Sequence, residues 1–166
     1  MRIYLPATFA ELQQLVDDGM VGPAPLTAFA VTDGLRAWYD DGDDGEALEY
    51  AAMLDAARAS LRLIHAEPGS LPRRAVIAAD VEDTAVTVRD DIDRGVVRVT
   101  TGVALDSVAS VHVDGEDAEG AVAAAADSIL RAELGDETAQ EVVDDVEGFE
   151  LSWYAAQEIA ALVDLH

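Results

Sequence analysis

The side chains best suited to chemistry are threonines, carboxylates and one arginine that follow the apolar runs expected to form strands. Thr8 follows the first run, Thr32 follows the second, and Asp80 follows the third. If the three strands are parallel, their carboxyl ends meet at one edge of the sheet, where ligands bind in open α/β sheets. The predicted crevice then contains Thr8, Thr32, Asp33, Arg36, Asp80, Glu82 and Asp83.

Purely structural roles also account for these residues, and the sequence leaves both interpretations open. Thr8 and Thr32 suit helix N-caps, and Arg36 stands three residues after Asp33, the spacing of a helical ion pair. The acidic group that begins at Asp80 suits a polar turn. The crevice hypothesis fails if Thr32 and Asp80 leave the sheet at opposite ends, or if the surface between them is flat.

His112 is the histidine whose position invites a functional interpretation. It lies in an apolar run between two valines, so its side chain should point away from the face that the valines bury, together with Ser110. Paired with Asp80 or Asp114, it is a weak candidate for a metal ligand or a base. A histidine on a half-buried sheet face is the commoner situation, so we expect no bound metal.

The acidic run from Asp40 to Glu46 suggests calcium, because this ion needs several oxygen ligands close together. An EF-hand loop starting at Asp41 would place Gly45 at position 5, where an acid is needed, and Ala52 at position 12, where glutamate is needed. The run therefore predicts a solvated loop before a helix, and no calcium site.

Several catalytic motifs are missing. The chain has no cysteine and no lysine, which excludes thiol nucleophiles, cysteine-bound zinc, Schiff bases and the ordinary P-loop. No glycine-rich loop follows the first predicted strand, and no serine stands in a Gly-x-Ser-x-Gly turn. We expect no cofactor and a non-catalytic binding or regulatory protein that acts through protein contacts or self-association. The alternative is a small-molecule or metal-dependent enzyme that uses Asp and Glu in the predicted crevice.

The charge balance excludes partners more firmly than it suggests any. Thirty-four carboxylates face ten arginines, for a net charge of −24. Such a surface repels phosphate backbones and anionic lipids, so we expect no binding to nucleic acid or membranes. No apolar run approaches the roughly 20 residues of a membrane span, and the first residues lack a signal-peptide core, so the cytoplasm is expected. The acidity fits either a GC-rich genome or adaptation to salt, and a protein partner or homodimer stays open.

The unpaired carboxylates predict that the stability depends on salt. Because they repel one another, and because salt at 0.1 M screens charges beyond roughly 10 Å, the melting temperature should rise with added sodium chloride. Thermal denaturation at low salt and at about 0.5 M salt tests this. An unchanged melting temperature would contradict it.

Hydrophobic periodicity predicts one α/β or α+β domain over residues 1–166, with helices packed on a mixed parallel and antiparallel sheet. The strand, helix and strand at the start predict a parallel pair with a right-handed crossover, whereas the later strands suit antiparallel hairpins. The expected strands are 2–5, 27–32, 75–79, 85–89, 96–100, 108–113 and 151–155. The expected helices are 8–19, 33–39, 118–134, 137–147 and 158–165, together with a longer helix that has Glu46 in its first turn and is ended by Pro68 and Gly69.

Four segments carry a resemblance to a known family. The opening MRIYLPAT, then PLTAFAVTDGLRAWY, SVHVDG and the closing LSWYAAQE together resemble a small uncharacterised protein family of high-GC actinobacteria. The resemblance covers nearly the whole chain. It implies a GC-rich genome and a cytosolic setting, and it carries no activity, cofactor or catalytic residue.

Overall fold

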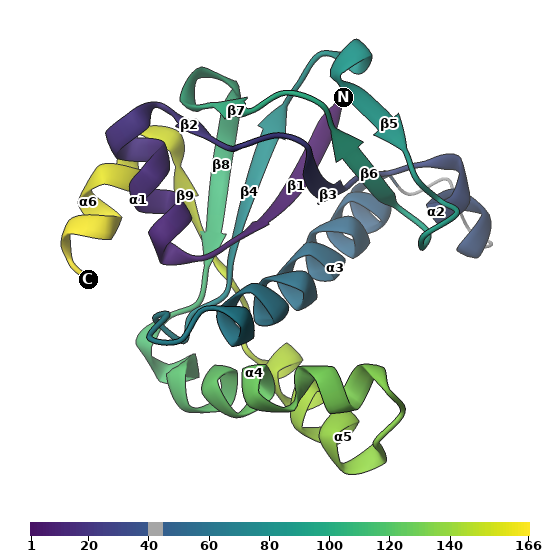
Figure 1. The fold of residues 1–166 in the computed structure, drawn as a ribbon, viewed down its shortest axis with the longest axis vertical. Coiled ribbons are helices and arrows are strands. Elements are labelled where there is room, and N and C mark those ends of the chain that lie inside the picture. Colours follow the sequence, from purple (N-terminus) through teal and green to yellow (C-terminus); the bar gives the residue numbers. More distant parts are fainter. Residues whose placement is uncertain (40–44) are drawn as a thin grey trace.

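A computed structural model describes residues 1–39 and 45–166, which form an α+β fold around an antiparallel sheet (Figure 1). The seven strands of this sheet lie in the order β5-β6-β3-β1-β4-β8-β9, and a separate two-stranded sheet pairs β2 with β7. The strands are β1 (Arg2–Ala7), β2 (Met20–Val21), β3 (Leu26–Phe29), β4 (Ala75–Asp80), β5 (Val86–Val88), β6 (Val96–Val99), β7 (Val103–Ala104), β8 (Val108–Val113) and β9 (Ser152–Ala155). The helices are α1 (Phe9–Asp18), α2 (Asp33–Trp38), α3 (Gly45–Ala66), α4 (Glu119–Glu133), α5 (Glu137–Asp145) and α6 (Ile159–Asp164).

The predicted mixed sheet is wrong, because the first two long strands pair antiparallel. Tyr4 of β1 lies opposite Phe29 of β3, and β4 pairs antiparallel with the other edge of β1. A parallel crossover requires the helix to return the chain directly to the edge where the first strand began. Here residues 20–25, which include β2, come between α1 and β3 and turn the chain before it enters the sheet. The antiparallel arrangement predicted for the later strands is confirmed.

The alternation of side chains along the strands gives the sheet two buried faces. One face carries Ile3, Leu5, Ile77 and Val111 and packs against α1 and α6. The opposite face carries Tyr4, Phe29, Val76 and Ala78 and packs against α3. Because α3 meets the sheet largely through alanines, it lies close to the centre of this face and leaves the two flanks of the face uncovered.

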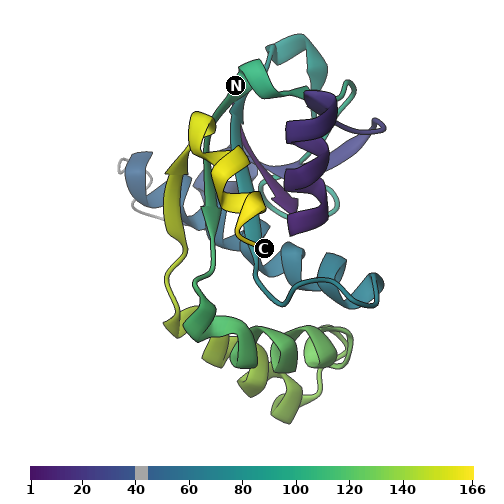
Figure 2. The ribbon, with the colours of Figure 1, turned by 90° about the vertical axis from the view of Figure 1, so that its left-hand side faces the viewer.

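Helices α4 and α5 form a second layer beyond α3, below the lower end of the sheet (Figure 2). Their apolar side chains cover Leu61 and Ile64 at the end of α3. A buried ion pair lies where the chain leaves the sheet for these helices: the Arg74 guanidinium donates to both Asp114 carboxylate oxygens at 2.8 Å and to the Phe149 carbonyl at 2.9 Å. Arg74 precedes β4, Asp114 follows β8, and Phe149 precedes β9. The pair therefore ties three strand ends together.

Thr8 occupies the N-cap of α1, as its position suggested, but its side chain makes no capping hydrogen bond. Its buried hydroxyl has no hydrogen-bond partner among the described residues. At α2 the expected cap is confirmed, since the Thr32 hydroxyl accepts from the Leu35 amide at 3.2 Å.

Candidate functional site

A groove opens on the face of the sheet beside the first half of α3. The register aligns Tyr4 with Ala78 and Ala78 with Ser110, so side chains from β1, β4 and β8 form one row on this face. Because Ala78 carries only a methyl group, the floor stays low between Tyr4 and Ser110. The groove has a volume of about 800 Å³, within the range of small-molecule sites. We call it the aromatic groove; its lining is Arg2, Tyr4, Gly45, Glu46, Glu49, Tyr50, Met53, Ala78, Ser110, His112 and Trp153.

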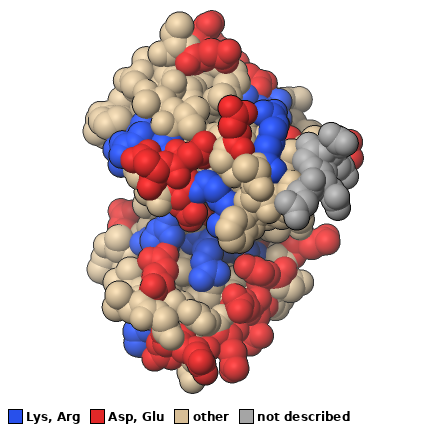
Figure 3. All heavy atoms as spheres, turned by 90° about the vertical axis from the view of Figure 1, so that its right-hand side faces the viewer, with Lys and Arg blue, Asp and Glu red and all other residues tan. Residues whose placement is uncertain are grey.

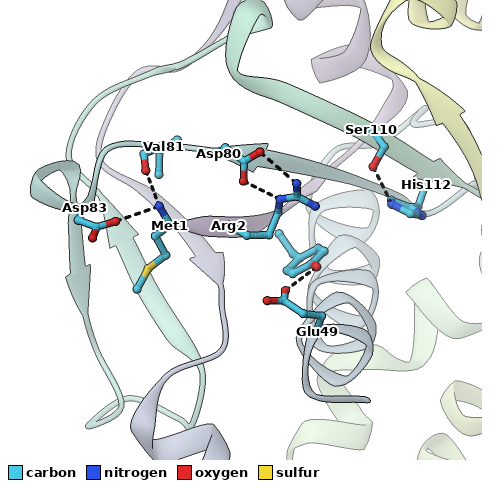
Figure 4. Close-up of polar contacts among 9 residues, drawn as sticks. Met1, Arg2, Glu49, Asp80, Val81, Asp83, Ser110 and His112 are labelled. Atoms are coloured by element: carbon cyan, nitrogen blue, oxygen red, sulfur yellow. Dashed lines mark hydrogen bonds and ion pairs between the residues drawn. The ribbon is translucent and has the colours of Figure 1, made fainter. Parts of the chain in front are cut away.

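Two polar contacts fix the side chains at the β1 end of the floor (Figure 4). The Tyr4 hydroxyl donates to Glu49 of α3 at 2.6 Å, and burial together with this hydrogen bond raises the pKa of Tyr4 above its usual value. The Arg2 guanidinium donates to both oxygens of Asp80 at 2.8 and 3.0 Å. These hydrogen bonds hold the pKa of Asp80 below its usual value. Tyr4 is therefore a neutral hydroxyl near pH 7, and Arg2 and Asp80 are both ionised.

The β8 end of the floor carries a serine and a histidine. The Ser110 hydroxyl lies 3.1 Å from His112 Nε2, and both side chains point away from the valine face as the alternation predicted (Figure 4). Burial lowers the pKa of His112, and the positive charge of Arg2 lowers it further. The imidazole is therefore neutral at pH 7 and offers one nitrogen lone pair and one N–H.

Aromatic side chains border the groove on both sides. Trp153 of the edge strand β9 pairs with His112 in the register and is 61% exposed, and Tyr50 of α3 is 53% exposed. The indole and phenol rings present apolar faces to solvent that a planar ligand would cover. Met53, which is largely buried, adds a flexible apolar side chain to the lining.

The charges in the groove favour a neutral or cationic molecule over an anion. Arg2 and Asp80 neutralise each other, His112 is neutral, and Glu46 and Glu49 add carboxylates from α3. The whole chain carries a net charge of −24, and the resulting field adds to the local preference of this groove for a cation.

The crevice predicted from the sequence is not assembled as a whole, because the antiparallel sheet removes Thr8 from it. Ala7 of β1 lies opposite Ala75, where β4 begins, so Thr8 and Asp80 lie at opposite ends of the strands. Thr32 and Asp80 do leave the sheet at the same end, since β3 and β4 both run antiparallel to β1. The premise that the carboxyl ends of three parallel strands meet is wrong, because β1 runs opposite to the other two.

Structural contacts of α2 account for Thr32, Asp33 and Arg36. The Thr32 hydroxyl caps the helix and donates to Asp90 at 2.6 Å, and Arg36 pairs with Asp33 at 3.5 Å on the exposed surface. This is the structural role that the sequence left open for them. None of the three lines the aromatic groove.

The acidic group after β4 lines a different hollow. Asp80, Glu82 and Asp83 border a cavity of about 770 Å³ between this turn and residues 100–107, and Asp83 accepts from the Met1 amino group at 2.9 Å. In the candidate metal pair of Asp80 and His112, Asp80 binds Arg2 and His112 contacts Ser110. Asp114 is bound by Arg74.

The described part of the chain holds neither a cluster of metal ligands nor a helix suited to a membrane. Within residues 1–39 and 45–166, no three histidine or carboxylate side chains lie close enough to hold a metal ion. The acidic run considered for calcium lies outside the described residues except for Gly45 and Glu46. None of the described helices has the length and apolarity needed to span a membrane.

Sequence reasoning missed most of the aromatic groove. Arg2 and Tyr4 alternate with buried Ile3 and Leu5, a period-two signal that places them together on the other face of β1. The pairing of Trp153 with His112 required the register of β8 and β9, which no local pattern encodes. Only Ser110 and His112 were placed correctly relative to each other.

Fold and groove together define an antiparallel α+β protein with a mixed polar and aromatic groove beside its longest helix. The chain belongs to the family described as "Family of unknown function (DUF6912)", whose model matches residues 1–163. The resemblance to an uncharacterised family is thereby confirmed. Comparisons with curated proteins and with solved structures found no match.

Proposed function

We propose that this protein is a non-catalytic binding protein that holds a small, ring-bearing, neutral or cationic molecule in the aromatic groove. The observation that carries the proposal is the combination of the exposed rings of Tyr50 and Trp153 with a polar floor whose groups are already fixed in position. Small-molecule sites are mostly apolar hollows with a few placed polar groups. The binding class expected from the sequence is kept, but a small molecule replaces a protein surface as the ligand.

Each part of the groove has a role in this binding. The ring of the ligand lies against Trp153 and Tyr50, where stacking or a cation–π contact is worth about 0.5–2 kcal/mol. His112 and Ser110 exchange hydrogen bonds with polar atoms of the ligand. Glu49 is held by Tyr4 and attracts a positive group, whereas an anion would meet two carboxylates of α3.

Three probes that share one ring and differ in charge test the proposal. We expect benzamidine, a cation, to bind more tightly than neutral benzamide, and benzamide more tightly than anionic benzoate, because of the carboxylates in the groove. Trp153 fluorescence reports the binding in a Trp38→Phe background. Preference for benzoate at this site, or no quenching by any of the probes at millimolar concentrations, would contradict the proposal.

The tryptophan at the rim provides the matched variant. Trp153→Ala should weaken benzamidine binding about tenfold, since it removes one aromatic wall. Trp38→Ala is the control, because Trp38 is equally exposed but lies outside the groove. Calorimetric titration measures both variants. Equal losses in the two variants would show that binding does not occur in the aromatic groove.

A further inference from the structure

A second hollow lies on the other flank of α3 and gathers arginines, although the protein is strongly acidic. It lies between α3 and strands β3 and β6 and has a volume of about 440 Å³. Figure 3 shows arginine side chains gathered across the middle of this face, with carboxylates beside them and over the surface around them. We call it the arginine cleft; its lining is Thr27, Phe29, Asp55, Arg58, Arg62, Ile92, Asp93, Val96, Arg98 and Glu133.

The fold brings these arginines together from two elements. Arg58 and Arg62 are four residues apart and share one side of α3, and Arg98 lies on β6 opposite Thr27 of β3. Arg98 shares the α3 face of the sheet with Val96, two residues before it.

The three arginines differ in the hydrogen bonds and ion pairs that they form within the protein. Arg62 pairs with Glu133 at 2.5 Å, so its charge is neutralised. Arg58 approaches Asp144 and Glu147 only at 3.7 and 4.0 Å. The Arg98 side chain forms no hydrogen bond or ion pair with any described residue, and its Nε is buried without a partner. An N–H that is withdrawn from water and left unpaired costs free energy, which a ligand that accepts this hydrogen bond would recover.

The other side chains that line the cleft indicate what the uncharged part of a ligand should be. Phe29, Ile92 and Val96 supply apolar surface next to the guanidinium groups, and Ile92 is half exposed. Asp55 makes no hydrogen bond or ion pair with the described residues. The charged groups that act on Asp55 are two arginines, Arg94 and Arg58, and two carboxylates, Asp93 and Glu147.

We propose that the arginine cleft binds a small organic oxyanion, a carboxylate or a phosphate, whose charged group contacts Arg98 and Arg58 and whose apolar part lies against Phe29, Ile92 and Val96. Guanidinium groups match both oxyanions because their planar N–H donors bind two oxygens at once. This site is separate from the aromatic groove and favours the opposite ligand charge. Its existence does not depend on the proposed function.

The test follows the side-chain Nε–Hε signal of Arg98 by two-dimensional NMR during titration with benzoate, phenyl phosphate and inorganic phosphate at constant ionic strength. We expect benzoate or phenyl phosphate to shift this signal and those of Ile92, with inorganic phosphate weaker because it lacks the apolar part. Saturation by benzoate alone identifies a carboxylate ligand, and saturation by phenyl phosphate alone identifies a phosphate ligand. Benzamidine should leave the Arg98 signal unchanged.

Two substitutions move the affinity in opposite directions. Arg98→Met keeps the apolar stem of the side chain and should weaken binding at least about tenfold, the usual effect of losing a hydrogen bond to a charged group. Asp55→Asn removes a carboxylate from the cleft and should strengthen binding about threefold. Arg36→Met is the control for charge, since Arg36 is outside the cleft.

Three outcomes would overturn the proposal. These are equal affinity in the wild type and Arg98→Met, equal weakening by Arg36→Met, and shifts scattered over the surface that disappear as the ionic strength is raised. The Asp55→Asn measurement stands independently if Arg98→Met lowers the stability, because it looks for a gain in affinity.

Discussion

Asp114→Ala should lower the free energy of unfolding by about 3–5 kcal/mol, because it leaves the buried Arg74 guanidinium without its charge partner. The side chains of Arg74 and Asp114 are 3% and 0% exposed, so water cannot replace the lost carboxylate. The same carboxylate also accepts from the Arg74 backbone amide at 2.7 Å. Urea denaturation followed by circular dichroism measures the change.

Asp80→Ala is the matched control for this prediction. Asp80 forms an ion pair with Arg2 at the same 2.8 Å, but the side chains of Arg2 and Asp80 are 38% and 60% exposed. Solvent screens exposed pairs, so Asp80→Ala should cost much less than Asp114→Ala. If the two substitutions cost the same, burial does not set the strength of the Arg74–Asp114 pair.

Asp90→Ala should lower the free energy of unfolding by about 2–3 kcal/mol, because one carboxylate connects α2 to the turn between β5 and β6. It accepts from the Thr32 hydroxyl at 2.6 Å, the Gly95 amide at 2.9 Å and the Gly34 amide at 3.1 Å. There is no room for a side chain at Gly34, where a Cβ would lie 2.5 Å from the Asp90 carboxyl carbon. Thermal and urea denaturation test the loss.

Asp91→Ala is the control. Asp91 is next in the chain but its side chain bonds only to Arg89, so its loss should leave the stability almost unchanged.

The pH dependence of the stability provides a second measurement. Partial burial alone would raise the pKa of Asp90, but its three hydrogen bonds outweigh burial and lower it. The part of the contribution that depends on the charge of Asp90 is therefore complete above the ordinary value of 3.8 and is lost as the pH falls through the lower folded value. The difference in stability between wild type and Asp90→Ala should shrink toward that acid limit, and a constant difference down to low pH would contradict this.

Local patterns in the sequence determined most of the elements, because helix and strand periodicity depends on neighbouring residues alone. The helix at 33–39, the hairpin strands at 85–89 and 96–100 and the last two long helices were all placed within a few residues of α2, β5, β6, α4 and α5. The same alternation predicted that His112 and Ser110 share a face, and the structure places them 3.1 Å apart. The two-residue strands β2 and β7 were missed, since two residues carry no period.

Packing on the longest helix was predicted less well. Helical spacing aligns Tyr50, Leu54 and Leu61 in one apolar stripe, the usual sign of a buried face. Tyr50 and Leu54 are nevertheless exposed, and the first half of α3 meets the sheet through Leu48, Ala52 and Ala56. Large apolar side chains are not the best contact where a helix lies close to a sheet, because small ones allow the approach. Tyr50 was thereby left free to form a wall of the aromatic groove.

Only the tertiary structure decided the direction of the strands and, through it, both candidate sites. Because β3 and β4 run opposite to β1, Thr8 lies at the other end of the strands from Asp80 and outside the predicted crevice. The register of β8 and β9 placed Trp153 beside His112, and the position of β6 brought Arg98 to the flank of α3 that carries Arg58. Strand direction follows from long-range pairing and chain reversal between elements, and this information is spread over the whole chain. The excess of negative charge follows from the composition alone. That Ser110 and His112 lie on one face of the sheet follows from the local alternation of side chains, so neither required the tertiary structure.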